Sequence, residues 1–143
     1  MLKDLPRYRL RKVSVGRFKA VCGEQVVALA PFTVLVGRNG SGKSTLVEAL
    51  QWIDAALRKD ANAACDPYRG MRDLINKQSP GRSFQIELEW TPDTDAELSS
   101  ENLFVPPERI DYSIEVGVAK NQAVVLDERL LTQTAGVEKG WVA

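Results

Sequence analysis

The feature that most constrains this chain is the glycine-rich stretch at residues 37–45, Gly-Arg-Asn-Gly-Ser-Gly-Lys-Ser-Thr. It matches the phosphate-loop pattern G-x-x-x-x-G-K-[ST] at every fixed position. Glycines let successive backbone N–H groups turn inward around an anion, and the following helix directs its N-terminal N–H groups and dipole at the same point. The motif therefore predicts a strand, a phosphate-binding loop and a helix in succession.

Both flanks of the loop agree with this prediction. Residues 32–36 form a β-branched run after Pro31, and we expect them to be a buried strand. Behind the loop, apolar residues recur at helical spacing, and Arg58 and Lys59 follow where cations suit a helix C-terminus. The expected apolar stripe consists of Leu46, Leu50, Ile53 and Leu57. A glycine-rich turn that only joins strand to helix is the alternative, and the complete motif with both flanks disfavours it.

Composition bounds the class of protein. The 143 residues suit one domain, and 44% apolar and 27% charged residues are ordinary for a globular protein. The absence of histidine excludes histidine metal sites and histidine acid–base catalysis. Two cysteines without a C-x-x-C spacing suit a reduced compartment. We find no signal peptide or membrane-spanning run, so we expect a cytoplasmic protein without a membrane partner.

Charge gives little support for DNA as a partner, because the formal net charge is zero. The distribution is uneven, however, since the start of the chain is basic with Asp4 as its one acid. The basic residues there are Lys3, Arg7, Arg9, Arg11, Lys12, Arg17 and Lys19. A solvated face is the favoured interpretation of this cluster over a DNA-facing edge, because aromatic residues do not alternate with the charges.

The remaining patterns predict mainly strands. Loose alternation predicts an edge strand over 8–15 and a second strand over 26–29. Asp66 and Pro67 favour a short helix that continues through Met71, Leu74 and Ile75.

Further along, residues 84–90 alternate as a half-buried strand, and 91–107 read as an exposed polar connection. Strands over 112–118 and 123–131 around a turn at 120–122 predict a β-hairpin. Residues 132–143 show no element that could close a domain.

Residues 13–19, Val-Ser-Val-Gly-Arg-Phe-Lys, together with 32–50 resemble the start of an ABC-type ATPase head. The resemblance is to the branch with SMC, RecF and OLD nucleases, often named AAA family ATPases; Asn39 and the strand–turn–strand lead-in carry it. It is strong over 13–57 and weaker over 84–131. It implies an α/β fold: an incomplete P-loop NTPase core with an antiparallel β subdomain and a tendency to three layers.

The same resemblance implies one partial head domain over 1–143. Its parts are 1–58 (strands, phosphate loop and helix), 59–82 (a helical or loop connection) and 83–143 (antiparallel strands).

The resemblance also implies ATP and Mg²⁺ as cofactors, and dimerisation of two heads around shared nucleotide. A second head or a downstream C-terminal part is thus the expected partner, and relatives act in DNA repair, chromosome maintenance or phage defence. The implied nucleotide contacts are Gly37, Arg38, Asn39, Gly40, Ser41, Gly42, Lys43, Ser44 and Thr45. Lys43 is the catalytic candidate through its charge on the β- and γ-phosphates, and Ser44 is the Mg²⁺ ligand. Lys19 matches a lead-in basic residue that can approach the nucleotide in relatives.

Two distal motifs of such ATPases are in doubt. The sequence has no signature-like L-S-G-G stretch. Residues 123–128, Ala-Val-Val-Leu-Asp-Glu, resemble an apolar strand that ends in acids. Asp127 as an outer metal ligand and Glu128 as the base form one interpretation. The return strand of a hairpin is the other, and we favour it because the alternating partner strand and the short turn fit.

The function predicted from sequence is ATP binding, with hydrolysis only when distal motifs or a partner complete the site. Whether the isolated chain is an ATPase enzyme stays open. A small P-loop kinase is one alternative, although the loop comes late in the chain and an arginine-rich lid is not evident. A module that uses ATP only to gate contact with protein or DNA is the other.

Overall fold

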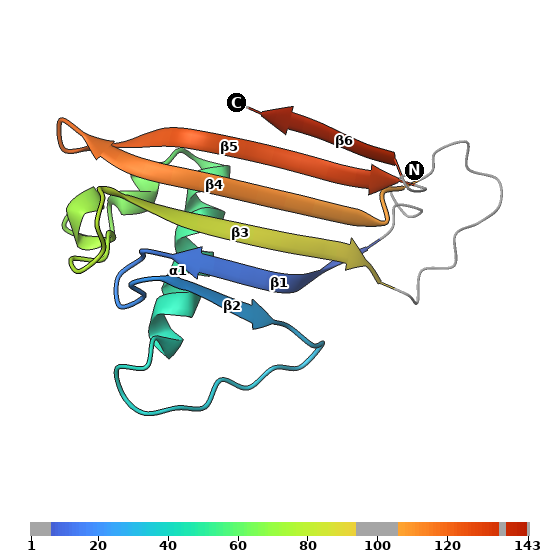
Figure 1. The fold of residues 1–143 in the computed structure, drawn as a ribbon, viewed down its shortest axis with the longest axis horizontal. Helices are drawn as coiled ribbons and strands as arrows, with labels where there is room; N and C mark the ends of the chain where they lie inside the picture. The colour runs from blue at the N-terminus through green and yellow to red at the C-terminus, as the bar shows by residue number, and fades with distance from the viewer. Residues whose placement is uncertain (1–6, 94–105, 135–136, 143) are drawn as a thin grey trace.

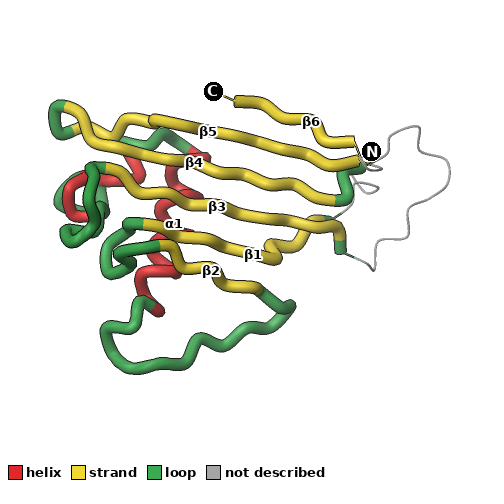
Figure 2. The backbone as a smooth tube through the Cα atoms, in the orientation of Figure 1, coloured by secondary structure: helices red, strands yellow, loops and turns green. Residues whose placement is uncertain are grey.

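The computed structural model describes residues 7–93, 106–134 and 137–142. Six strands form one antiparallel sheet in the order β2-β1-β3-β4-β5-β6, and helix α1 crosses one face of it (Figures 1 and 2). The elements are β1 Tyr8–Gly16, β2 Glu24–Ala28, α1 Lys43–Arg58, η1 Ala63–Cys65, η2 Met71–Asp73, β3 Ser83–Pro92, β4 Arg109–Ala119, β5 Gln122–Thr134 and β6 Val137–Val142. The described residues thus form two layers, a sheet and a helix with short 3₁₀ turns, where the sequence indicates a tendency to three.

Side chains of the sheet alternate between a covered and an open face. Phe84, Ile86 and Leu88 of β3 are buried, and the acids and glutamine between them face away, because successive strand residues point to opposite sides. Neighbouring strands add to the covered side in register, with Val15 opposite Ile86 and Val116 opposite Phe84. The expected strand over 84–90 is therefore confirmed with its burial.

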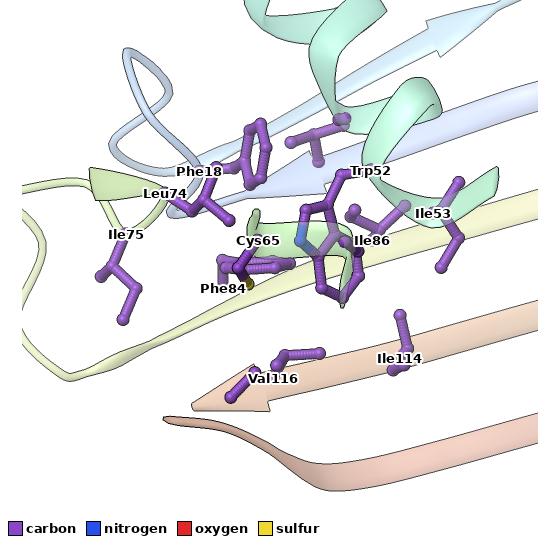
Figure 3. Close-up of a cluster of buried hydrophobic side chains, with 14 of the residues drawn as sticks. Phe18, Trp52, Ile53, Cys65, Leu74, Ile75, Phe84, Ile86, Ile114 and Val116 are labelled. Atoms are coloured by element: carbon purple, nitrogen blue, oxygen red, sulfur yellow. The ribbon is translucent and has the colours of Figure 1, made fainter. Parts of the chain in front are cut away.

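Helix α1 covers this apolar face with one side of its surface. Trp52 and Phe18 both meet the Phe84 ring edge-on, each at a centroid distance of 4.9 Å (Figure 3). The buried face of α1 consists of Thr45, Leu46, Ala49, Trp52 and Ile53. The predicted stripe is therefore only half right, because Leu57 is 57% exposed. Helical spacing identifies an apolar face only approximately, and the position of the sheet decides which residues along that face are covered.

The hairpin predicted near the end of the chain is confirmed. Strands β4 and β5 pair with Ala119 opposite Gln122, which leaves a two-residue turn. Both turn residues, Lys120 and Asn121, have positive φ angles of 49° and 66°. This left-handed pair suits the right-handed twist of the two strands.

Three other expectations need correction. The first strand is not an edge strand, because β1 lies between β2 and β3. The expected helix after Asp66 is reduced to the short turn η2, since Gly70 at φ 99° interrupts a helical path, and η1 ends before Asp66. An additional strand, β6, pairs with β5, because the free edge of β5 supplies hydrogen-bond partners that a short sequence pattern does not reveal. Of the expected connection over 91–107, residues 94–105 lie outside the described residues.

The largest correction concerns residues 32–36, which are neither a strand nor buried. Phe32 is 83% exposed and Val36 is 88% exposed. No strand among the described residues pairs with this segment, because the sheet ends at β2 and the chain leaves it before the phosphate loop (Figure 1). An apolar run becomes a buried strand only where a neighbouring strand pairs with its backbone and other elements pack over its side chains.

None of the helices in the described ranges is long and apolar enough to cross a membrane.

Candidate nucleotide site

The phosphate loop lies between the exposed segment 32–36 and the first turn of α1. Gly40 and Gly42 have φ angles of 83° and 89°, in the left-handed region that a glycine adopts without strain. Gly42 is the N-cap of α1, and its carbonyl accepts the first helical hydrogen bond from Leu46 at 3.1 Å. Ser41 N–H donates to the Arg38 carbonyl at 3.2 Å, which closes a tight turn. The glycines therefore stand where the backbone reverses into the helix.

Lys43 is the first residue of α1, and its ammonium lies inside the curve of the loop. Nζ donates to the carbonyl oxygens of Gly37 and Arg38, both at 2.6 Å, and to Ser41 Oγ at 3.3 Å. An ammonium has three donors, so these three oxygens satisfy it completely. A bound phosphate would offer anionic oxygens in place of the neutral carbonyls, and the attraction between opposite charges would then add to the hydrogen bonds of the ammonium.

The interior of the loop is tight at its first glycine. A Cβ added to Gly37 would lie 2.8 Å from Ser41 Oγ and 3.8 Å from Lys43 Cδ. A side chain at this position would thus push into the space between the loop backbone and the lysine. This close approach of backbone to lysine fits a cradle for a phosphate group, which needs bare amides along its wall.

Mg²⁺ would depend on few protein ligands here. Ser44 is exposed in the first turn of α1, where its hydroxyl can reach a metal held by phosphates. The described residues contain no group of three or more His, Cys, Asp or Glu that could hold a metal ion by itself. The donor set fits a magnesium ion carried in with the nucleotide, because Mg²⁺ keeps several waters and substrate phosphates as ligands.

Lys19 is engaged by α1. Its Nζ lies 2.6 Å from Glu48 Oε1 and 5.1 Å from the centroid of the Tyr68 ring. Glu48 follows Ser44 by one helical turn, so Lys19 does lie beside the helix that carries the phosphate loop. Sequence reasoning singled out Lys19 but missed Glu48 and Tyr68. The i, i+4 spacing from Ser44 was the available signal for Glu48.

The acidic pair lies elsewhere on the sheet. Asp127 and Glu128 belong to β5, and β4, β3 and β1 separate β5 from β2 beside the loop. Strands are about 4.8 Å apart, so roughly 19 Å separates β5 from β2. Glu128 accepts a 2.6 Å hydrogen bond from the Tyr112 hydroxyl, and Asp127 pairs with Arg129 at 2.9 Å. The hairpin interpretation is correct, and neither acid approaches the loop.

The Tyr112 hydroxyl, which donates this hydrogen bond, has a shifted pKa. Burial raises the pKa of the Tyr112 hydroxyl well above its ordinary value, and the Glu128 carboxylate raises it further. The hydroxyl therefore remains a donor to Glu128 at neutral pH. The carboxylate is held as a structural acceptor on β5.

The basic start of the chain is largely neutralised by partners within the fold. Four of its cations form ion pairs: Arg9 with Asp93, Lys12 with Glu89, Arg17 with Glu115, and Lys19 with Glu48. Lys3 and Asp4 lie outside the described residues. Because paired cations offer little net charge to a polyanion, the geometry favours the solvated-face interpretation.

The fold defines the class of protein. A solved structure described as "Structural biochemistry of ATP-driven dimerization and DNA stimulated activation of SMC ATPases" matches 88% of this chain and 71% of its own chain, with a TM-score of 0.56 and 17% identity. The likeness shows that the chain has the fold of an SMC ATPase head, an α/β P-loop NTPase fold. The expected fold class is confirmed.

The family follows from sequence comparison. The family model described as "AAA domain, putative AbiEii toxin, Type IV TA system" matches residues 32–141, and the chain belongs to this family. The expected resemblance to the SMC, RecF and OLD branch is confirmed by the relatives below. ATPase families of this kind use nucleotide, typically with Mg²⁺.

Three curated relatives are similar over different stretches. "Old nuclease" of Escherichia phage P2 is 42% identical over 55 residues, which cover 38% of this chain and 9% of the relative. "Structural maintenance of chromosomes protein 1" of Arabidopsis thaliana is 27% identical over 132 residues, 86% of this chain and 10% of the relative. "DNA replication and repair protein RecF" of Thermosynechococcus vestitus (strain NIES-2133 / IAM M-273 / BP-1) is 33% identical over 78 residues, which cover 54% of this chain and 18% of the relative. The aligned regions thus span less than a fifth of each relative.

Proposed function

We propose that residues 37–45 bind ATP with Mg²⁺, and that the chain is the nucleotide-binding part of an ATPase. The observation that carries this proposal is the Lys43 ammonium, enclosed by the Gly37 and Arg38 carbonyls inside the glycine turn. The same loop supplies the amides for the phosphates, and Ser44 supplies the hydroxyl for the metal. Thr45, the last residue of the stretch, is buried in the first turn of α1.

The chemistry of these residues is positioning and neutralisation. The loop amides orient the phosphates, and Lys43 stabilises negative charge on the β- and γ-phosphates. Mg²⁺, when bound, would supply further neutralisation of the phosphate oxygens. Because Asp127 and Glu128 are remote, neither can act as a general base at the loop, and we expect turnover by this chain alone to be slow.

We further propose that another polypeptide completes the site, either a second head or a further part of a longer protein. Support comes from the exposed segment 32–36, where Val34 is 63% and Val36 is 88% exposed just before the loop. A β-branched run with open edges is suited to strand addition. A cation supplied in trans is worth about 10³ to 10⁵ in rate in related systems, so this partner would decide whether ATP is cleaved quickly.

Isothermal titration calorimetry with MgATP and a non-hydrolysable analogue tests the binding site. We expect the chain to bind both ligands, and Lys43→Ala to weaken binding at least tenfold with an unchanged far-UV spectrum. The matched control is Lys59→Ala, which removes the same charge just after the C-terminal end of the same helix. Unchanged affinity in Lys43→Ala, or an equal loss in both variants, would overturn the assignment.

Phosphate release from MgATP tests the second part. We expect Glu128→Gln to leave nucleotide affinity and the slow rate unchanged, because Glu128 of β5 accepts a hydrogen bond from Tyr112 of β4. Rapid hydrolysis by the pure 143-residue chain that Glu128→Gln abolishes would show that the acidic pair does act at the loop.

A further inference from the structure

Glu48 places a carboxylate on the helix that begins at the phosphate loop. It follows Ser44 by four residues, which is about 6 Å along the helix axis. Helical side chains lean toward the N-terminus, so the Glu48 side chain extends back toward the turn that carries Ser44. Without a partner, this negative charge would repel the phosphates of a nucleotide bound at the loop.

Lys19 supplies that partner from the loop between β1 and β2. Its Nζ lies 2.6 Å from Glu48 Oε1, and the two side chains are only 28% and 30% exposed. The ammonium also lies over the Tyr68 ring, 5.1 Å from its centroid. Because the pair is largely shielded from water, its two charges interact more strongly than those of a fully exposed pair.

The fold holds the Lys19 backbone in one unusual conformation. Its φ angle is 47°, and Arg17, two residues earlier, also has a positive φ of 58°. Lys19 N–H donates to the Leu74 carbonyl at 2.8 Å, and Asn76 Nδ2 donates to the Lys19 carbonyl at 2.6 Å. Outside tight turns, non-glycine residues adopt this conformation mainly where surrounding contacts impose it, and such positions cluster at functional sites.

Apolar packing fixes the same loop against α1. Phe18, next to Lys19, is fully buried and meets the Phe84 ring, which in turn meets Trp52 of α1 (Figure 3). The loop is therefore tied to the helix twice, by this row of rings and by the ion pair. The buried Phe18 fixes the position of the loop, and the adjacent Lys19 is thereby held within ion-pair distance of Glu48.

From this geometry we propose that Lys19 is a positioning residue that acts on the bound nucleotide through Glu48. It neutralises the Glu48 carboxylate, so the phosphate loop keeps its attraction for a triphosphate. The inference rests on the proposed ATP site. It differs from direct contact between Lys19 and nucleotide, because it makes the effect of removing Lys19 depend on the presence of Glu48.

The test measures MgATP affinity by calorimetry in Lys19→Met, Glu48→Gln and the double variant. A unit charge about 10 Å from a ligand of net charge about −2 alters affinity roughly four- to fifteenfold, for effective dielectric constants of about 80 to 40. We expect Lys19→Met to lose affinity by this factor, and Glu48→Gln to bind at least as well as the original chain. The double variant should recover to within about twofold of the original chain.

The control is Lys12→Met. Like Lys19, Lys12 forms an ion pair with a glutamate, in this case Glu89 at 3.0 Å, but Lys12 lies within β1. This control should leave affinity unchanged. The deficit of Lys19→Met should also shrink as salt is raised from about 0.05 to 0.5 M, because ions screen a partly exposed charge.

A double variant as weak as Lys19→Met would overturn the inference and indicate direct contact with nucleotide. Full affinity in Lys19→Met would overturn it as well. If the original chain itself does not bind MgATP, the proposed function fails first, so the two failures are distinguishable. Equal thermal midpoints in Lys19→Met and the double variant would show that the difference in affinity between them does not come from a difference in folding.

Discussion

Two phenylalanines that look equivalent in sequence should differ about sixfold or more in the stability that they lose on truncation to alanine. Phe84 is fully buried and meets the Phe18 and Trp52 rings, each at 4.9 Å, so Phe84→Ala should cost about 3–5 kcal/mol of unfolding free energy. Phe32 is 83% exposed in the apolar run before the phosphate loop. Full burial of such a ring contributes about 3 kcal/mol and less than a fifth is covered, so Phe32→Ala should cost about 0.5 kcal/mol.

Urea unfolding followed by tryptophan fluorescence measures both variants. With an m-value of about 2 kcal/mol/M, the midpoint should fall by roughly 1.5–2.5 M in Phe84→Ala and by about 0.25 M in Phe32→Ala. The original chain and both variants should share one m-value, which the comparison requires. A loss above about 1.5 kcal/mol in Phe32→Ala would mean that the segment is buried in solution and that its exposed placement is wrong.

Three further predictions concern single groups. Gly37→Ala should weaken MgATP binding at least fivefold in calorimetry without unfolding the chain, since its Cβ would lie 2.8 Å from Ser41 Oγ; unchanged affinity would contradict the tight loop. The raised pKa of Tyr112 lets the folded state keep a proton that the unfolded chain releases above pH about 10, so stability should fall there as pH rises. Tyr112→Phe should reduce that fall in urea titrations between about pH 9 and 11, and an equal fall would refute it. An aromatic disulfide reagent should label exposed Cys22 quickly and buried Cys65, whose thiol pKa is raised by burial, only on unfolding; fast labelling of both would contradict the packing.

Local chemistry made several elements predictable from the sequence. The left-handed glycines 40 and 42, the helix that opens at Lys43, and the alternation of β3 are properties of neighbouring residues. The two-residue turn at Lys120 and Asn121 is likewise local. Short-range sterics and side-chain period determine these features, so a pattern read along the chain finds them.

Contacts between distant segments decided the rest. The pattern of apolar residues shows that a run could be buried, but it does not show whether a partner strand exists. Residues 32–36 are therefore predicted from sequence to be buried, although Phe32 is 83% exposed. The same limit hid the internal place of β1 and the addition of β6, because strand order depends on which edges meet. The pairing of Lys19 with Glu48 joins residues 29 positions apart. Only the packing of the β1–β2 loop against α1 brings the two charges together, because no sequence pattern encodes which distant side chains the fold will juxtapose.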